Sequence, residues 1–172
     1  MKRVLIPLIL SLCYIADSLF VQFFSLESFG GTYILVPHFL LVVLVLMGIF
    51  YRPKTSIMYA FIFGMLYDAF YTGVLGIYLF FFPLAVYITT KMMKVLQSNL
   101  VISGIVVLFN ITIVEFLVYG VNLLINHDLM NLADFLNLRL WPTLVLNLAF
   151  FIVIGLPMRN FLTRRVREEM ID

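Results

Sequence analysis

Long apolar runs separated by short polar gaps dominate the chain. Four of these runs occupy residues 4–24, 33–50, 100–125 and 140–158. A helix that crosses a membrane needs roughly 17 to 25 mostly apolar residues, so each run predicts one transmembrane helix. The polar gaps are too short to bury a separate water-soluble core. The pattern therefore predicts a single all-α integral membrane domain over residues 1–172.

The apolar run 56–90 is too long for a single crossing. As one straight helix, its 35 residues would extend about 52 Å, whereas the hydrocarbon core is roughly 30 Å thick. An acid, a hydroxyl and a glycine gather at 68–73, which favours a turn there. We expect two short helices over 56–68 and 74–90, and therefore a bundle of six transmembrane helices.

The basic residues test this number independently, because they accumulate on the cytoplasmic side of a membrane protein. With six spans and the N-terminus inside, ten of the eleven lysines and arginines face the cytoplasm, and Arg139 faces outward. With five spans, six face outward and five face inward. The charges favour six spans, with both chain ends in the cytoplasm.

Two polar segments are expected to lie on the membrane surface. The outer segment 126–139 carries an apolar helical stripe, with Asp128 as a candidate N-cap and Trp141 following it. The stripe contains Leu129, Leu132, Ala133 and Leu136. An ordinary loop is the alternative. The tail 159–172 is basic first and acidic last, and we expect it to lie along the anionic inner leaflet as a cytoplasmic basic tail.

Composition agrees with a lipid environment and narrows the function classes. The chain is 64% hydrophobic and 12% charged, with a mean hydropathy of +1.13, whereas soluble domains are about half apolar and a quarter charged. The net charge of +2 does not indicate nucleic-acid binding. The single cysteine, Cys13, excludes an intrachain disulfide and is expected to be a small buried hydrophobe.

Three acids fall inside predicted spans: Asp17, Asp68 and Glu115. An acid at a helix centre costs about 2.5 to 3.5 kcal/mol on insertion scales, so each is a functional candidate. Asp17 and Asp68 are expected near one level towards the outer surface. Because the predicted spans contain no lysine or arginine, the acids lack an obvious ion-pair partner. Glu115 is either a structural acid satisfied by hydrogen bonds or part of a proton or cation relay.

The sequence shows no enzyme site. His38 and His127 lack the spacing of a metal or catalytic motif, and no nucleophile elbow or phosphate-binding glycine loop is present. No cofactor or metal is expected, and His38 is read as a satisfied polar residue beside Pro37.

Small residues indicate close helix packing in the folded-back segment. Ala60 and Gly64 lie four positions apart on one helix face, which permits close approach of a neighbour. Gly73 and Gly76 then allow the return helix to start tightly.

These residues resemble the signature of the bacterial rod shape-determining MreD family. The similar features are Arg52-Pro53-Lys54, the run Phe63-Gly64-Met65-Leu66-Tyr67-Asp68, the run Gly73-Val74-Leu75-Gly76, and Pro37 at the start of the second span. The resemblance implies a non-enzymatic scaffold in the bacterial plasma membrane. Its implied partners are MreC and, indirectly, MreB filaments, a SEDS glycan polymerase and a class B penicillin-binding protein.

The resemblance also implies a fold like the substrate-binding (S) subunit of energy-coupling-factor transporters, which supplies an alternative function in vitamin or small-molecule capture. Such subunits carry an Ala-x-x-x-Ala-like strip on their first helix, and here only Ala16 is available. The scaffold function is therefore favoured. A polar cavity with Asp17, His38 and Glu115 remains open, as does a partner motif formed by Pro37, Gly64, Asp68, Gly73 and Gly76.

Overall fold

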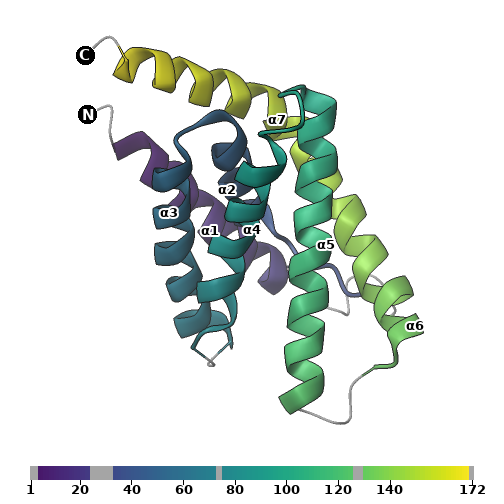
Figure 1. The fold of residues 1–172 in the computed structure, drawn as a ribbon. Helices are drawn as coiled ribbons and strands as arrows, with labels where there is room; N and C mark the ends of the chain where they lie inside the picture. Colours follow the sequence, from purple (N-terminus) through teal and green to yellow (C-terminus); the bar gives the residue numbers. More distant parts are fainter. Residues whose placement is uncertain (1–3, 24–32, 73–74, 126–129, 171–172) are drawn as a thin grey trace.

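The structure, a computed structural model, describes residues 4–23, 33–72, 75–125 and 130–170. Within these residues the regular elements are all helical (Figure 1). In chain order they are α1 (Leu5–Phe23), α2 (Phe39–Phe50), α3 (Pro53–Tyr67), the π-helical turn η3 (Asp68–Thr72), α4 (Ile77–Met92), α5 (Leu100–Ile125), α6 (Leu132–Asp134), the π-helical turn η4 (Phe135–Leu140) and α7 (Trp141–Glu169).

Helix α2 forms the centre of the bundle. It contacts α1, α3, α4, α5 and α7, and every residue from Phe39 to Gly48 is buried. A helix that is apolar on all sides needs apolar neighbours on all sides, and the uninterrupted run of Leu, Val and Met meets that condition. The other helices therefore surround α2.

The segment 56–90 folds back on itself as the antiparallel pair α3 and α4 (Figure 1). Helix α3 continues through η3 before the chain turns, and Gly76 begins the return with a φ of 116°. This left-handed conformation is open to glycine at little cost. The pair therefore forms a hairpin, which we call the capped hairpin (residues 53–92).

Helix α7 changes direction within its length. It first packs along α5 and then crosses the end of the bundle, as the yellow ribbon in Figure 1 shows. Pro157 lies inside the helix, and proline is a common cause of such bends. We call residues 158–169 the distal part of α7. It packs on the first turns of α1 and the last turns of α2 through the apolar residues Ile6, Ile9, Val43, Met47, Met158, Phe161 and Leu162.

The described helices make the chain an all-α membrane protein. Three helical stretches are long and apolar enough to cross a bilayer: Leu5–Phe23, Leu100–Ile125 and Leu132–Glu169. Phe39–Phe50 and Ile77–Met92 are apolar but shorter. The number of six spans therefore stays a prediction. The largest differences from the expected spans are that the second run is helical only from Phe39 and that the last helix continues beyond 158 to Glu169; α3 and α4 each begin three residues from the expected position, at Pro53 and Ile77.

Candidate functional site

The non-helical residues 33–38 precede α2 and lie against α7 and η4. The backbone N–H of His38 donates to Oδ1 of Asn147 at 2.8 Å, and the carbonyl of Val36 accepts from Nδ2 of the same amide at 3.0 Å. The N–H of Val36 donates to the Thr143 hydroxyl at 3.2 Å. Irregular backbone at membrane depth requires such internal partners. The first turns of α7 thus replace the hydrogen bonds that a helix would make itself.

Asp17 of α1 caps the N-terminus of α2. Its carboxylate accepts the backbone N–H of Phe39 at 2.9 Å and of Leu40 at 3.3 Å, and the hydroxyl of Tyr67 at 3.0 Å. The side chain is 1% exposed. An anion at a helix N-terminus is stabilised by the unpaired N–H groups and the helix dipole. Asp17 therefore joins α1 and α3 to the start of the central helix.

The carboxylate of Glu115 on α5 contacts side chains from two other parts of the chain, one through each oxygen. Its Oε1 lies 2.7 Å from Nε2 of His38, and its Oε2 lies 2.8 Å from Nε of Arg139 on η4. Glu115 and His38 are fully buried, whereas the Arg139 side chain is 25% exposed. The carboxylate acceptor places the histidine proton on Nε2. His38 Nδ1 has no hydrogen-bond partner within the described part of the chain.

We call Asp17, His38, Glu115, Arg139 and Asn147 the polar centre. It gathers the residues that were predicted to line a polar cavity, Asp17, His38 and Glu115, around the start of α2. Each of them makes hydrogen bonds to protein groups, and the polar cavity itself stays a prediction. The expectation that the intramembrane acids lack an ion-pair partner is wrong for Glu115, because Arg139 reaches into the bundle from the outer segment.

Asp68 forms a second buried anion site at the turn of the capped hairpin. Its carboxylate accepts the backbone N–H groups of Gly76 at 2.8 Å, Tyr78 at 2.8 Å and Leu79 at 3.0 Å. These groups open α4, so one side chain caps that helix and fixes the turn. Asp17 and Asp68 were expected near a water-accessible level, whereas both carboxylates are buried.

Gly64 lets the two helices of the hairpin touch. A Cβ atom at this position would collide with the carbonyl oxygen of Tyr78 and would lie 2.9 Å from its carbonyl carbon. The hairpin needs glycine here because the obstacle is backbone, which a rotamer change does not remove. Gly73, predicted to share this role, lies outside the described residues.

Tyr67 connects the two anion sites. Its hydroxyl donates to Asp17, its backbone precedes Asp68, and its ring packs 5.0 Å from that of Tyr78 and 5.3 Å from that of Phe82. Pro37 is buried immediately before His38. Among the described residues of the predicted partner motif, Pro37 therefore lies beside the start of α2, and Gly64, Asp68 and Gly76 lie in the hairpin.

The outer segment is helical from Leu132 and continuous with α7. Its N-cap is Asn131, whose side chain accepts the N–H of Asp134 at 2.8 Å; Asp128 and Leu129 lie outside the described residues. Leu132 is exposed and Leu136 partly so, whereas Phe135 is buried and stacks 4.3 Å from Tyr119. Phe135 therefore packs the segment against α5, whereas Leu132 and Leu136 keep exposed surface.

Sequence reasoning gave Arg139 and Thr143 no role in the site, and it did not show which acid Tyr67 meets or which backbone groups Asn147 bonds. A signal existed for two of them. Thr143 and Asn147 are polar residues four positions apart in an apolar run, a spacing that places both on one helix face. Among the described residues, no group of histidine, cysteine and acidic side chains is arranged to hold a metal ion. The polar centre and the Asp68 site can hold charged side chains, protons and backbone N–H groups in fixed positions.

Comparison with known proteins gives a consistent result. A family model described as rod shape-determining protein MreD matches residues 1–165. The chain is 36% identical to the rod shape-determining protein MreD of Bacillus subtilis (strain 168) over 172 residues, which cover 98% of this chain and 100% of the relative. No solved structure matches the chain with significance. The likeness to the substrate-binding subunit of energy-coupling-factor transporters therefore stays a prediction.

Proposed function

Because the chain belongs to the MreD family of rod shape-determining proteins, we propose that it is a non-enzymatic membrane scaffold in the machinery that elongates the cell wall. The role in rod shape follows from the family. In the proposal, the protein binds MreC, and through MreC it links MreB filaments to a SEDS glycan polymerase and a class B penicillin-binding protein.

The observation that carries this proposal is the capped hairpin. Asp68 ties three backbone N–H groups at the turn, and Gly64 brings the two backbones into contact. A hairpin fixed in this way presents a constant outer surface. That surface is apolar, since its exposed side chains include Met58, Phe61, Ile62, Met65, Phe80, Leu84 and Tyr87. Such a surface suits the membrane helix of a partner that packs by shape.

The test compares two destabilising substitutions in different places. Asp68→Ala removes the cap of the hairpin, whereas Arg139→Ala breaks the ion pair of the polar centre and leaves the hairpin intact. We expect Asp68→Ala to reduce co-purification of MreC and Arg139→Ala to retain it, with both proteins present in the membrane. Equal loss of MreC in the two variants would mean that the hairpin is not the contact.

The outer segment offers a second proposed contact. Leu132 is exposed and Leu136 partly exposed, and an apolar helix at the membrane surface suits the juxtamembrane region of a partner. Leu129, which was predicted to belong to the same stripe, lies outside the described residues. Leu132→Ser combined with Leu136→Ser should leave membrane insertion unchanged and weaken MreC binding. Phe135→Ser is the matched control for a change that loosens the segment itself.

We place the protein in the bacterial inner membrane as a multi-pass protein with cytoplasmic ends. The first turns of α1 and the distal part of α7 pack together at one end of the bundle, which agrees with an even number of crossings and with the distribution of basic residues. With Cys13 replaced, cysteines introduced at Ser28 and Asn131 should react with a reagent added from outside. Reaction only from the cytoplasmic side would reverse the orientation.

Capture of a vitamin or another small molecule is the alternative. The break before α2 and the buried polar centre favour it, since transporters bind ions and substrates at interrupted helices. Mass spectrometry after purification in mild detergent separates the two functions. A retained vitamin with an ATPase module supports the transporter, and peptidoglycan-synthesis proteins support the scaffold.

A further inference from the structure

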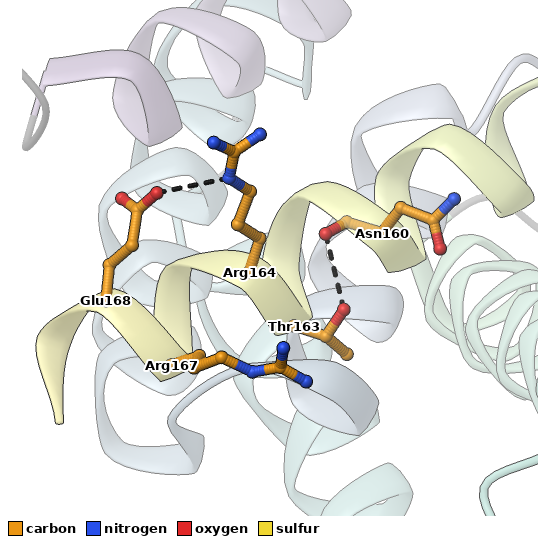
Figure 2. A pocket seen from close by; sticks show the side chains of 5 residues that line it. All are labelled: Asn160, Thr163, Arg164, Arg167 and Glu168. Atoms are coloured by element: carbon orange, nitrogen blue, oxygen red, sulfur yellow. Dashed lines mark hydrogen bonds and ion pairs between the residues drawn. The ribbon is translucent and has the colours of Figure 1, made fainter. Parts of the chain in front are cut away.

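We propose that the distal part of α7 carries a discrete binding site for the phosphate of an anionic phospholipid headgroup. Side chains from a single stretch of helix line an open hollow (Figure 2). Its volume is about 390 Å³. The lining residues are Asn160, Thr163, Arg164, Arg167 and Glu168. The inference rests on the proposed orientation, in which this end of the bundle meets the inner leaflet.

The hollow lies at the depth of the lipid headgroups. A crossing takes about 20 helical residues, so a helix that enters lipid near Trp141 reaches the other surface near residue 160. The distal part of α7 is held at that level by Met158 and Leu162, which are 5% and 1% exposed. At its end, Glu169 accepts the hydroxyl of Tyr51 at 2.7 Å and pairs with Arg52 at 3.1 Å. The helix therefore lies across the bundle.

The lining has the chemistry of a phosphate site. Guanidinium groups bind phosphate oxygens with two parallel hydrogen bonds. Arg164 donates through Nε to Glu168 at 3.2 Å, and the guanidinium has four further N–H donors. Its side chain is 82% exposed. Arg167 also lines the hollow, and Glu168 is the one acid in the lining. Two arginines and one glutamate give the hollow a net charge of +1.

The helix face that carries the hollow continues into lipid-facing residues, which favours a lipid over a free anion. Val153, Leu156, Asn160, Thr163 and Arg167 follow one another at intervals of three or four residues, the spacing of a single helix face. Val153 and Leu156 are 77% and 53% exposed. One face of α7 thus changes from apolar to cationic at the level where a phospholipid changes from acyl chain to phosphate.

The experiment is native mass spectrometry of the full chain in mild detergent, titrated with phosphatidylglycerol or phosphatidylcholine. We expect tighter binding of phosphatidylglycerol. Arg164→Gln combined with Arg167→Gln should weaken it about 25-fold, because one cation near an anionic surface is worth about fivefold. Lys91→Gln combined with Lys94→Gln removes the same charge from the last turn of α4 and the residues that follow it, outside the hollow, and should leave binding unchanged.

Glu168→Gln tests the hollow by a gain of affinity, which misfolding would not produce. It removes the acid from the lining, and we expect it to strengthen binding of phosphatidylglycerol. Three results would overturn the proposal: unchanged binding in the arginine double variant, equal weakening in the lysine control, or equal affinity for phosphatidylcholine. Displacement of the lipid by millimolar inorganic phosphate would assign the hollow to a free anion. Arginine-dependent capture of a soluble acidic protein, with lipid binding unaffected, would assign it to a protein partner.

Discussion

The guanidinium of Arg139 and the carboxylate of Glu115 lie 2.8 Å apart, although Arg139 comes from the outer segment and Glu115 from the middle of α5. The ion pair draws the π-helical turn η4 onto α5. Since His38 approaches the other oxygen of the same carboxylate, one acid connects three separate parts of the chain. Glu115 therefore joins the start of α2, α5 and η4.

Removal of the arginine should be more damaging than neutralisation of the acid. Arg139→Ala leaves the buried Glu115 without its ion-pair partner, and loss of one member of a buried pair costs about 3 to 5 kcal/mol. Glu115→Gln keeps an acceptor oxygen and should cost less. Thermal unfolding in detergent checks the order. Equal melting temperatures for Arg139→Ala and the wild type would show that the pair does not stabilise the bundle.

Loss of the Tyr67 hydroxyl should weaken the cap of α2. Tyr67→Phe keeps the ring packed and removes a hydrogen bond to a buried carboxylate, a change worth about 1.5 to 3 kcal/mol. Tyr119→Phe is the matched control, because its hydroxyl donates to the neutral carbonyl of Met130 at 3.1 Å. The control should lose only about 1 kcal/mol. A larger fall in melting temperature for Tyr67→Phe than for Tyr119→Phe would show that Asp17 is ionised and depends on the Tyr67 hydroxyl. Equal falls would show that it does not.

The two helical glycines Gly64 and Gly120 should respond to alanine in opposite ways. Gly64→Ala forces α3 away from the Tyr78 backbone, and overpacking of this kind costs about 1 to 3 kcal/mol. At Gly120 an added Cβ meets no atom within 4 Å, so alanine should stabilise α5 by up to about 1 kcal/mol through its higher helix propensity. Hydrogen exchange at the hairpin turn should rise only in Gly64→Ala.

The hydrogen bond between Tyr51 and Glu169 should hold the end of α7 in place. Burial, together with this bond to Glu169, raises the pKa of the Tyr51 hydroxyl to about 12. Because the pKa of Tyr51 is raised, this hydroxyl stabilises the folded state fully below pH 10, the ordinary pKa of tyrosine. The stabilisation is lost as the pH rises through about 12. At neutral pH, Tyr51→Phe should lower the free energy of local opening of residues 165–170 by up to about 1 kcal/mol. Hydrogen exchange in these residues should become faster.

The membrane class and the fold-back at Asp68 follow from local sequence properties. Hydropathy indicates which runs belong in lipid, and Asp68, Gly64 and Gly76 act within one hairpin whose partners are about ten residues apart. The polar centre depends instead on distant pairs. His38 meets Asn147 across 109 positions, and no local pattern shows which amide reaches which backbone group.

The sequence did not reveal that residues 33–38 are non-helical, for a related reason. These residues are apolar enough to continue a helix, and hydropathy does not distinguish an extended apolar segment from a helical one. The irregular backbone is stable because Thr143 and Asn147 supply hydrogen bonds from α7. Charge placement assigned Arg139 to the outer loop and could not show that its side chain pairs with Glu115 of α5, against which Phe135 also packs.

The long separation between His38 and its partners gives the protein an order of assembly during synthesis. A ribosome adds roughly 5 to 20 residues per second, so Glu115, 77 positions later, follows His38 by roughly 4 to 15 s, and Asn147 follows later still. During that interval the start of α2 has its Asp17 cap but lacks Glu115 and Asn147. The hydrogen bonds that fix the start of the central helix therefore become complete only after α5 and the first turns of α7 have been made, although α2 is the second helix to leave the ribosome.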